Sequence, residues 1–192
     1  MPCRQSCAAA LALMLSMCAV GSVSAGSLTM SGGLAVYKDD ILEDVIFGPT
    51  LSLRGRLDSG LYLGVEGMRL EGDQNDDGTA AANRGEVEIG IAQRATHNFD
   101  VLLGLEAVHL DRDWGPSRTD AGAAVGFRSA QNGLETEVHA LYRYPEGSDE
   151  SAQVGIRLRT GGVNLETGWG IGISVTWLTD ERMGSALVHR RF

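Results

Sequence analysis

The sharpest chemical pattern in this sequence is Asp73-Gln74-Asn75-Asp76-Asp77-Gly78. Oxygen-bearing side chains stand at alternate positions and glycine stands sixth, as in the first half of a calcium-binding loop. The second half departs from that pattern, because the twelfth position is Arg84 and strands are predicted on both sides. The pattern therefore predicts at most weak binding of calcium or magnesium by Asp73, Asn75 and Asp77, and otherwise a polar hairpin loop.

A second group, His109, Asp111 and Asp113, places an imidazole near two carboxylates at the end of a predicted strand. One arrangement for hydrolysis places a base and a nucleophile two residues apart on a strand, so that both side chains lie on one face within hydrogen-bond reach. None of the four histidines has a serine two residues away. We therefore expect a solvated loop shoulder here, no catalytic residue, no enzyme activity and no cofactor.

The other charged residues change sign from one predicted segment to the next. The set runs Arg54, Arg56, Glu66, Glu86, Glu88, Glu106, Arg128, Glu135, Glu137, Arg157, Arg159, Glu166, His189 and Arg191. If they share one face of consecutive antiparallel strands, nearly every acid has a base on an adjacent strand. Such cross-strand pairs contribute roughly 0.2–1 kcal/mol each. The pattern predicts an ordered network of opposite charges.

Ten predicted strands would position these residues. They lie near 28–37, 45–57, 60–70, 84–94, 98–110, 120–129, 133–144, 151–160, 162–178 and 183–192. The segment from Val163 to Trp177 alternates apolar with small or polar residues, which is typical of a strand with two different faces. No segment shows a helical period. The predicted fold is an all-β, closed up-and-down antiparallel barrel of about ten strands, with eight as the alternative.

The connections fall into two classes. Tight turns are predicted at 58–60, 96–98, 131–133 and 160–162, of which the last two carry Asn-Gly and Gly-Gly. Longer acidic segments are predicted at 38–44, 71–83, 111–120, 145–150 and 179–182. Short turns at one rim and longer loops at the other are typical of barrels in the bacterial outer membrane. The acidic rim is expected to hold divalent cations weakly.

The two faces of the strands differ in a way that favours a membrane barrel. One face is apolar, as in Val87, Ile89 and Ile91, and the other combines many glycines with isolated charges. Crowding in a narrow lumen explains that second face better than a solvated surface does. Aromatic residues are expected to form two girdles, with Tyr37, Phe47, Tyr142, Tyr144 and Trp177 at the loop rim and Phe99, Phe127 and Phe192 at the turn rim. Trp169 lies in mid-strand in this interpretation and does not fit either girdle.

The chain ends on an aromatic residue, Phe192, at the end of its last predicted strand. This ending resembles the C-terminal signature of small bacterial outer-membrane β-barrel proteins, the porin-like, OmpX-like or OmpW-like group, although Arg190 stands where that group has an apolar or aromatic residue. The resemblance covers the predicted barrel as a pattern of strands and turns and identifies no subfamily. It implies that Phe192 is part of the signal read by the barrel-assembly machinery.

Residues 1–25 are predicted to be a secretory signal peptide, with cleavage between Ala25 and Gly26. Arg4 is the sole charge there, 8–20 is an apolar run, and Val23-Ser24-Ala25 has the small residues of a cleavage site. Met17 disfavours a lipoprotein signal at Cys18. All three cysteines fall in this segment, so the barrel domain at 26–192 has no disulfide. Its 15 basic and 25 acidic residues give a net charge of −10, which argues against nucleic acid as a partner.

The expected function is that of a non-enzymatic surface or structural protein of the Gram-negative outer membrane, with acidic loops outside and a lumen plugged by charge. Outer-membrane lipid, lipopolysaccharide and the assembly machinery are the expected partners. One alternative is a narrow channel for small polar solutes. Another is a soluble, secreted or periplasmic lipocalin-like barrel that binds an apolar ligand.

Overall fold

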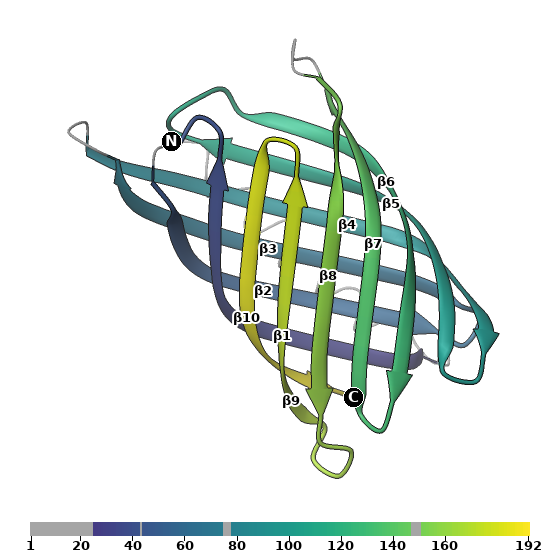
Figure 1. The fold of residues 1–192 in the computed structure, drawn as a ribbon. Helices are drawn as coiled ribbons and strands as arrows, with labels where there is room; N and C mark the ends of the chain where they lie inside the picture. The colour runs from purple at the N-terminus through teal and green to yellow at the C-terminus, as the bar shows by residue number, and fades with distance from the viewer. Residues whose placement is uncertain (1–24, 43, 75–77, 147–150) are drawn as a thin grey trace.

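The computed structural model describes residues 25–42, 44–74, 78–146 and 151–192. Over these ranges the chain forms a closed barrel of ten antiparallel strands, in which β1 pairs with β10 (Figure 1). The strands are β1 (Ala25–Asp39), β2 (Ile46–Leu57), β3 (Leu61–Gln74), β4 (Gly78–Thr96), β5 (Phe99–Arg112), β6 (Arg118–Gln131), β7 (Leu134–Glu146), β8 (Gln153–Val163), β9 (Trp169–Leu178) and β10 (Glu181–Arg191). The predicted fold class is confirmed, with ten strands and not eight.

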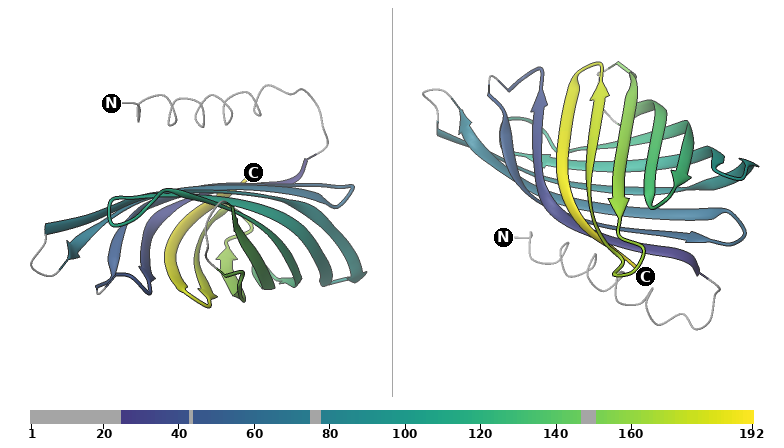
Figure 2. Two further views of the ribbon diagram at one scale, coloured as in Figure 1. Left: turned by 90° about the horizontal axis from the view of Figure 1, so that it is seen from above. Right: turned by 60° about the horizontal axis from the view of Figure 1, so that its bottom comes forward.

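The sheet curves round on itself, and in Figure 1 the strands of the near wall cross those of the far wall. Figure 2 shows the same closed wall from two further directions. Strands must tilt against the barrel axis to close a sheet, which explains this crossing. Because successive side chains point to opposite faces, each strand presents one row to the lumen and one row to the outside.

Turns of two or three residues at 58–60, 97–98 and 132–133 join strands at the rim where Phe192 lies. The other rim carries the 113–117 connection between β5 and β6, but also a two-residue turn, Thr179-Asp180, where the sequence predicts a longer loop. The Asn132-Gly133 turn has left-handed backbone at both residues, with φ of 51° and 80°. That geometry is the one that Asn-Gly favours between two strands, because it matches their twist. The predicted turns at 58–60, 96–98 and 131–133 are confirmed.

The predicted turn at 160–162 is wrong. These residues belong to β8, where Gly161 pairs with Gly172 of β9. The chain reverses at 164–168 instead, where the Asn164 side chain accepts hydrogen bonds from the backbone N–H groups of Glu166 and Thr167. Gly168 completes the turn with φ of 73°. Apolar residues continue the strand alternation through this turn by coincidence, so the two-residue period of the sequence does not reveal the turn.

The outer wall is apolar on every strand. Its exposed large side chains include Leu34, Leu51, Leu61, Val87, Leu103, Val125, Val138, Ile156, Ile173 and Val188, one from each strand. The inner wall carries the charged residues described below. At the loop end, the lumen is filled by an apolar cluster, here called the lid, which comprises Ala35, Tyr37, Leu42, Ile46, Met68, Leu70, Ala80, Ala82, Leu110 and Met183.

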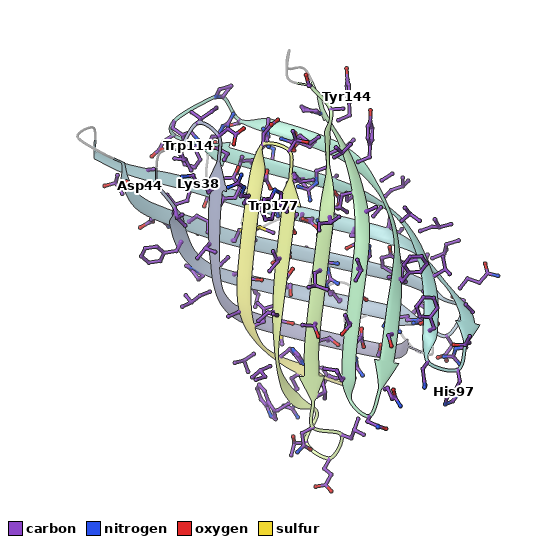
Figure 3. The ribbon with its side chains drawn as sticks, viewed as in Figure 1. Lys38, Asp44, His97, Trp114, Tyr144 and Trp177 are labelled. Atoms are coloured by element: carbon purple, nitrogen blue, oxygen red, sulfur yellow. The ribbon has the colours of Figure 1, made fainter. Side chains whose placement is uncertain are left out.

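Two aromatic residues lie where the sequence did not place them. Tyr37 is 1% exposed and belongs to the lid, so its assignment to the outer girdle is wrong. Trp169 begins β9 and lies at the turn rim, where it is half exposed. It therefore joins Phe99, Phe127 and Phe192 at that rim, while Phe47, Tyr142, Tyr144 and Trp177 are exposed toward the loop rim. Figure 3 shows Tyr144 and His97 near opposite ends of the barrel.

Candidate functional site in the lumen

Opposite charges in equal number line the described part of the lumen. The arginines are Arg54, Arg56, Arg84, Arg112, Arg118, Arg128, Arg143, Arg157, Arg159 and Arg191, and the acids are Asp39, Glu66, Glu86, Glu88, Asp100, Glu106, Asp120, Glu135, Glu137 and Glu181. They are buried or half-buried. Charge in a barrel interior is stable when it is paired and hydrogen-bonded. The pairs fall into layers along the barrel.

The layer nearest the turn rim is a chain of five residues. Arg56 lies 2.6 Å from Asp100, and Arg128 lies 3.1 Å from the same carboxylate. Arg128 also binds Glu135 through two of its nitrogens, at 2.8 and 2.7 Å. Arg191 closes the chain on Glu135. The parallel donors of a guanidinium suit this two-point contact, which fixes orientation as well as charge.

The middle layer joins opposite walls. Arg54 of β2 contacts both Glu88 of β4, at 3.4 Å, and Glu137 of β7, at 3.2 Å. Arg159 of β8 contacts the same two carboxylates, at 3.1 and 3.7 Å. Tyr62 donates its hydroxyl to Glu88. A Cβ at Gly90 or Gly104 would collide with the Tyr62 ring, so these glycines make room for it.

The third layer, here called the septum, is almost completely buried. It comprises Arg84, Glu86, Glu106, Arg143, Arg157 and Glu181, none more than 4% exposed. Arg157 lies 2.8 Å from Glu86 and 3.1 Å from Glu106. Arg143 contacts Glu106, and also Glu86 and Glu181 at 3.4 Å each. These contacts leave no water-sized passage around the two arginines, because their side chains are 0% and 1% exposed.

The pairing differs from the one that the sequence predicts. Most contacts cross the lumen and do not join neighbouring strands, as between Arg157 of β8 and Glu86 of β4. Glu66 accepts a hydrogen bond from Thr50, and His189 lies against Gly161 and Gly170. Glu166 is not in the lumen; it is exposed in the turn between β8 and β9.

Several lumen residues were assigned to the loop rim or missed. Asp39, Asp120 and Glu181 counted among the loop acids, but they point inward and are at most 5% exposed. Arg84, Asp100 and Arg143 were not placed in the network. These three residues lie inside the predicted strands and in phase with the inward glutamates, so the two-residue period already places them on the lumen face. Asp39 and Glu181 lie just beyond the predicted strand ends, and longer strands would have revealed them.

The Asp39 side chain holds the connection between β1 and β2 in place at the loop end of the lumen. One carboxylate oxygen accepts the backbone N–H groups of Ile41, at 3.1 Å, and Leu42, at 2.8 Å. The other accepts Arg112 Nη1 at 2.9 Å and Trp114 Nε1 at 3.2 Å. Leu42 is thereby held within the lid. The loop end of the lumen is closed by apolar side chains above the septum.

A cavity of about 160 Å³ remains on the turn side of the septum. On one side it is lined by the middle and turn-side layers. On the other it meets small residues of β1, β2 and β9, among them Ser31, Ser52 and Ser174. This vestibule can hold water or a small polar solute, and the septum lies beyond it.

The other predicted sites are not assembled by the described residues. Asp73 contributes backbone to β3, while its side chain and the whole of Asn75 and Asp77 lie outside the described part. His109 bonds Thr119 at 3.0 Å on the outer wall, and Asp111 instead accepts a hydrogen bond from Ser117. Within the described ranges no three His, Cys, Asp or Glu side chains meet as a metal site. No helix in those ranges has the length and apolarity to cross a membrane.

No protein-family model matches the sequence, and no curated protein matches it. Solved structures are similar at low identity. Neisserial surface protein A is 13% identical, with a TM-score of 0.42 and 86% of this chain and 94% of that chain covered. The KdgM porin, in complex with disordered oligogalacturonate, is 10% identical, with a TM-score of 0.46 and coverages of 85% and 99%. Ail of Yersinia pestis, in complex with the heparin analogue sucrose octasulfate, is 15% identical, with a TM-score of 0.39 and coverages of 86% and 98%.

Proposed function

We propose that this chain is an integral outer-membrane barrel with a closed lumen, which acts as a surface or structural protein and not as an enzyme. The observation that carries the proposal is the inverted wall, with apolar side chains outside and paired charges inside. Leu34 and Leu105 are 64% exposed and Ile171 is 73% exposed, whereas Arg143 is 0% exposed. A soluble lipocalin-like barrel has the opposite arrangement, with apolar residues lining its ligand cavity.

Hydrocarbon around the barrel accounts for this wall. Burial of apolar surface contributes about 25 cal/mol per Å², and contiguous exposed patches on soluble monomers rarely exceed a few hundred Å². A closed sheet also satisfies its backbone groups without water, as a bilayer requires. With the tight turns and Phe192 in the periplasm, the acidic loops face the medium. Lipopolysaccharide, other surfaces and weakly held calcium or magnesium are the proposed contacts of those loops.

A narrow channel for small polar solutes is the second candidate, and the vestibule favours it. The septum opposes it, because a solute would have to displace buried ion pairs. Conductance across a planar bilayer decides between the two. A closed barrel gives small or no current, whereas a large and steady current from the wild type makes the channel the better assignment.

Expression with the signal segment intact tests the membrane location. We expect the mature protein to begin at Gly26, to fractionate with the outer membrane, and to migrate differently in detergent before and after heating. A closed sheet without free edges resists unfolding in detergent, which explains the expected difference. Recovery from the soluble periplasm would contradict the proposal.

A further inference from the structure

Hydroxyl side chains form one wall of the vestibule. Along β1, Ser27, Thr29 and Ser31 follow each other at every second position and line the cavity, as do Ser52 of β2 and Ser174 of β9. Ser27 and Thr29, nearer the turn rim, are half-buried, whereas Ser31 is 6% exposed. Successive inward positions of β1 therefore carry hydroxyl groups from the turn rim into the barrel.

Ser31 and Ser52 belong to a row that crosses four neighbouring strands. Ser31 pairs in register with His189 of β10 on one side and with Ser52 on the other. Ser52 pairs in turn with Glu66 of β3. All four residues line the vestibule. Because neighbouring strands lie about 4.8 Å apart, the row presents its polar groups along a line of about 14 Å.

This row differs from the arginine layers of the vestibule, because most of its hydrogen-bonding capacity is unused. Ser31 and Ser52 are 6% and 4% exposed, and within the described ranges neither hydroxyl has a hydrogen-bond partner. Glu66 accepts one hydrogen bond, which the Thr50 hydroxyl donates to Oε1 at 3.1 Å. Buried polar groups are stable when they are hydrogen-bonded, so water or a ligand completes the row.

The charges around Glu66 disfavour an ionic ligand. In the described part of the chain no salt bridge joins Glu66 to an arginine. Arg54, Arg84 and Arg157 nevertheless interact with it electrostatically from a greater distance, so its charge is offset and a cation is not favoured. The arginines that line the vestibule are paired with carboxylates of the middle and turn-side layers, which disfavours an anion.

A neutral ligand rich in hydroxyl groups fits this lining. Its hydroxyls can donate to Glu66, and they can both donate to and accept from the two serines. Tyr62 and Leu187 line the same cavity and offer apolar surface to C–H groups. The cavity volume is about 160 Å³. This is the volume of about five water molecules in the liquid, which limits the ligand to the size of a monosaccharide.

We propose that the vestibule binds a small neutral polyol of monosaccharide size, which is held by Ser31, Ser52 and Glu66. The inference goes beyond the proposed function and requires only the folded barrel. The septum lies at the far end of the cavity, so the ligand enters and leaves on the turn side. No ion pair has to break for it to bind, because the serines and Glu66 lie outside the paired arginine layers.

The test measures binding to the folded barrel by ligand-observed NMR titration, in a detergent without a sugar head group. Glucose and myo-inositol are the neutral probes, and gluconate and glucosamine are charged probes of similar size. The double variant Ser31→Ala, Ser52→Ala and the single variant Glu66→Gln are compared with Ser185→Ala. Ser185 is a matched control, because it is 8% exposed and its hydroxyl has no partner among the described residues, but it does not line the vestibule.

We expect at least one neutral probe to bind the wild type saturably. Its affinity should fall about tenfold in the double variant and in Glu66→Gln, as for the loss of one or two hydrogen bonds, and should be unchanged in Ser185→Ala. Heat-modifiable migration first shows that each variant is folded, and Glu66→Gln keeps the test open if the double variant does not fold.

Four results would overturn the inference. Lack of saturable binding of both neutral probes removes the site, and wild-type affinity in the folded variants removes the residues assigned to it. An equal loss in Ser185→Ala assigns the effect to the fold. Tighter binding of gluconate or glucosamine than of the neutral probes replaces the polyol by an anion or a cation. Recovery of the protein from the soluble periplasm contradicts the proposed function alone, because binding is measured on the purified barrel.

Discussion

Arg157 of β8 reaches across the lumen to Glu86 of β4, with 2.8 Å between Nη2 and Oε1. Three strands separate β8 from β4 in the barrel wall, so this contact ties together two walls that share no backbone hydrogen bonds. Both side chains are almost completely buried. A buried pair adds little stability compared with apolar packing, but loss of Arg157 removes one positive charge that faces three buried carboxylates, Glu86, Glu88 and Glu106.

Replacement of Arg157 by Met should therefore lower the free energy of unfolding by about 3–5 kcal/mol. Urea unfolding of the barrel in lipid vesicles measures the change. Arg69→Met is the matched control, because Arg69 pairs with Glu71 on the exposed surface and should change stability by less than about 1 kcal/mol. Similar losses in the two variants would show that the septum pair has no special role.

Removal of two septum arginines should open a conducting path. We expect Arg143→Ser with Arg157→Ser to raise single-channel conductance above that of the wild type, since these two side chains lie at the centre of the septum and are 0% and 1% exposed. Arg56→Ser with Arg191→Ser removes as much charge from the turn-side layer and should leave the barrel closed. Conductance is compared for assembled, heat-modifiable protein. An equal current from both double variants would contradict the septum as the barrier.

Asp39→Asn should loosen the connection between β1 and β2. The amide keeps one acceptor oxygen but loses the charge that Arg112 requires, and a hydrogen bond to a charged group contributes about 1.5–3 kcal/mol. We expect faster thermolysin cleavage near Leu42 in intact cells or vesicles. Asp40→Asn, at an exposed neighbouring position, should be cleaved at the wild-type rate. Unchanged cleavage of the Asp39 variant would argue that the lid holds this segment without the carboxylate.

The two glutamates at 137 and 166 should respond differently to the same change. Glu137→Gln removes a carboxylate that contacts Arg54 and Arg159, and should destabilise the barrel by about 1–3 kcal/mol. Glu166→Gln changes an exposed turn residue and should stay within about 0.5 kcal/mol of the wild type. Thermal unfolding in detergent compares them. A larger loss of stability from Glu166→Gln than from Glu137→Gln would indicate that Glu166 belongs to the lumen charge network.

Phe192→Ala should reduce the amount of assembled barrel without changing secretion through the inner membrane. The terminal residue is exposed on the wall, and its backbone N–H and C=O both bond to Leu28 of β1. Phe127→Ala is the control, because Phe127 is an aromatic of the same rim that stacks on Phe99. Heat-modifiable migration of membrane fractions gives the assembled fraction. Equal losses would assign the effect to the girdle and not to the chain end.

The sequence alone predicted a closed antiparallel barrel, the order of its strands and which face of each strand is apolar, whereas the structure decided for ten strands over eight. These features depend on local sequence. A two-residue period is visible in any strand of sufficient length, and an Asn-Gly pair predicts a tight turn at its own position. The two-residue period led to a wrong prediction at 164–168, where the residues of a turn continue the strand alternation by coincidence. Val163 ends β8 and Trp169 begins β9, so the residues between them, Glu166 included, left the lumen.

Only the tertiary structure decided which charges meet. The sequence order suggested partners on adjacent strands, but long arginine side chains in a narrow closed barrel reach the opposite wall, as Arg54 does to Glu137. That distance depends on barrel diameter and strand stagger, which no single strand encodes. The position of Asp39 likewise depends on the closed barrel, because the sequence predicts a loop acid there. Closure of the sheet placed it above the septum, within reach of Arg112 and Trp114, and so completed the seal at the loop end.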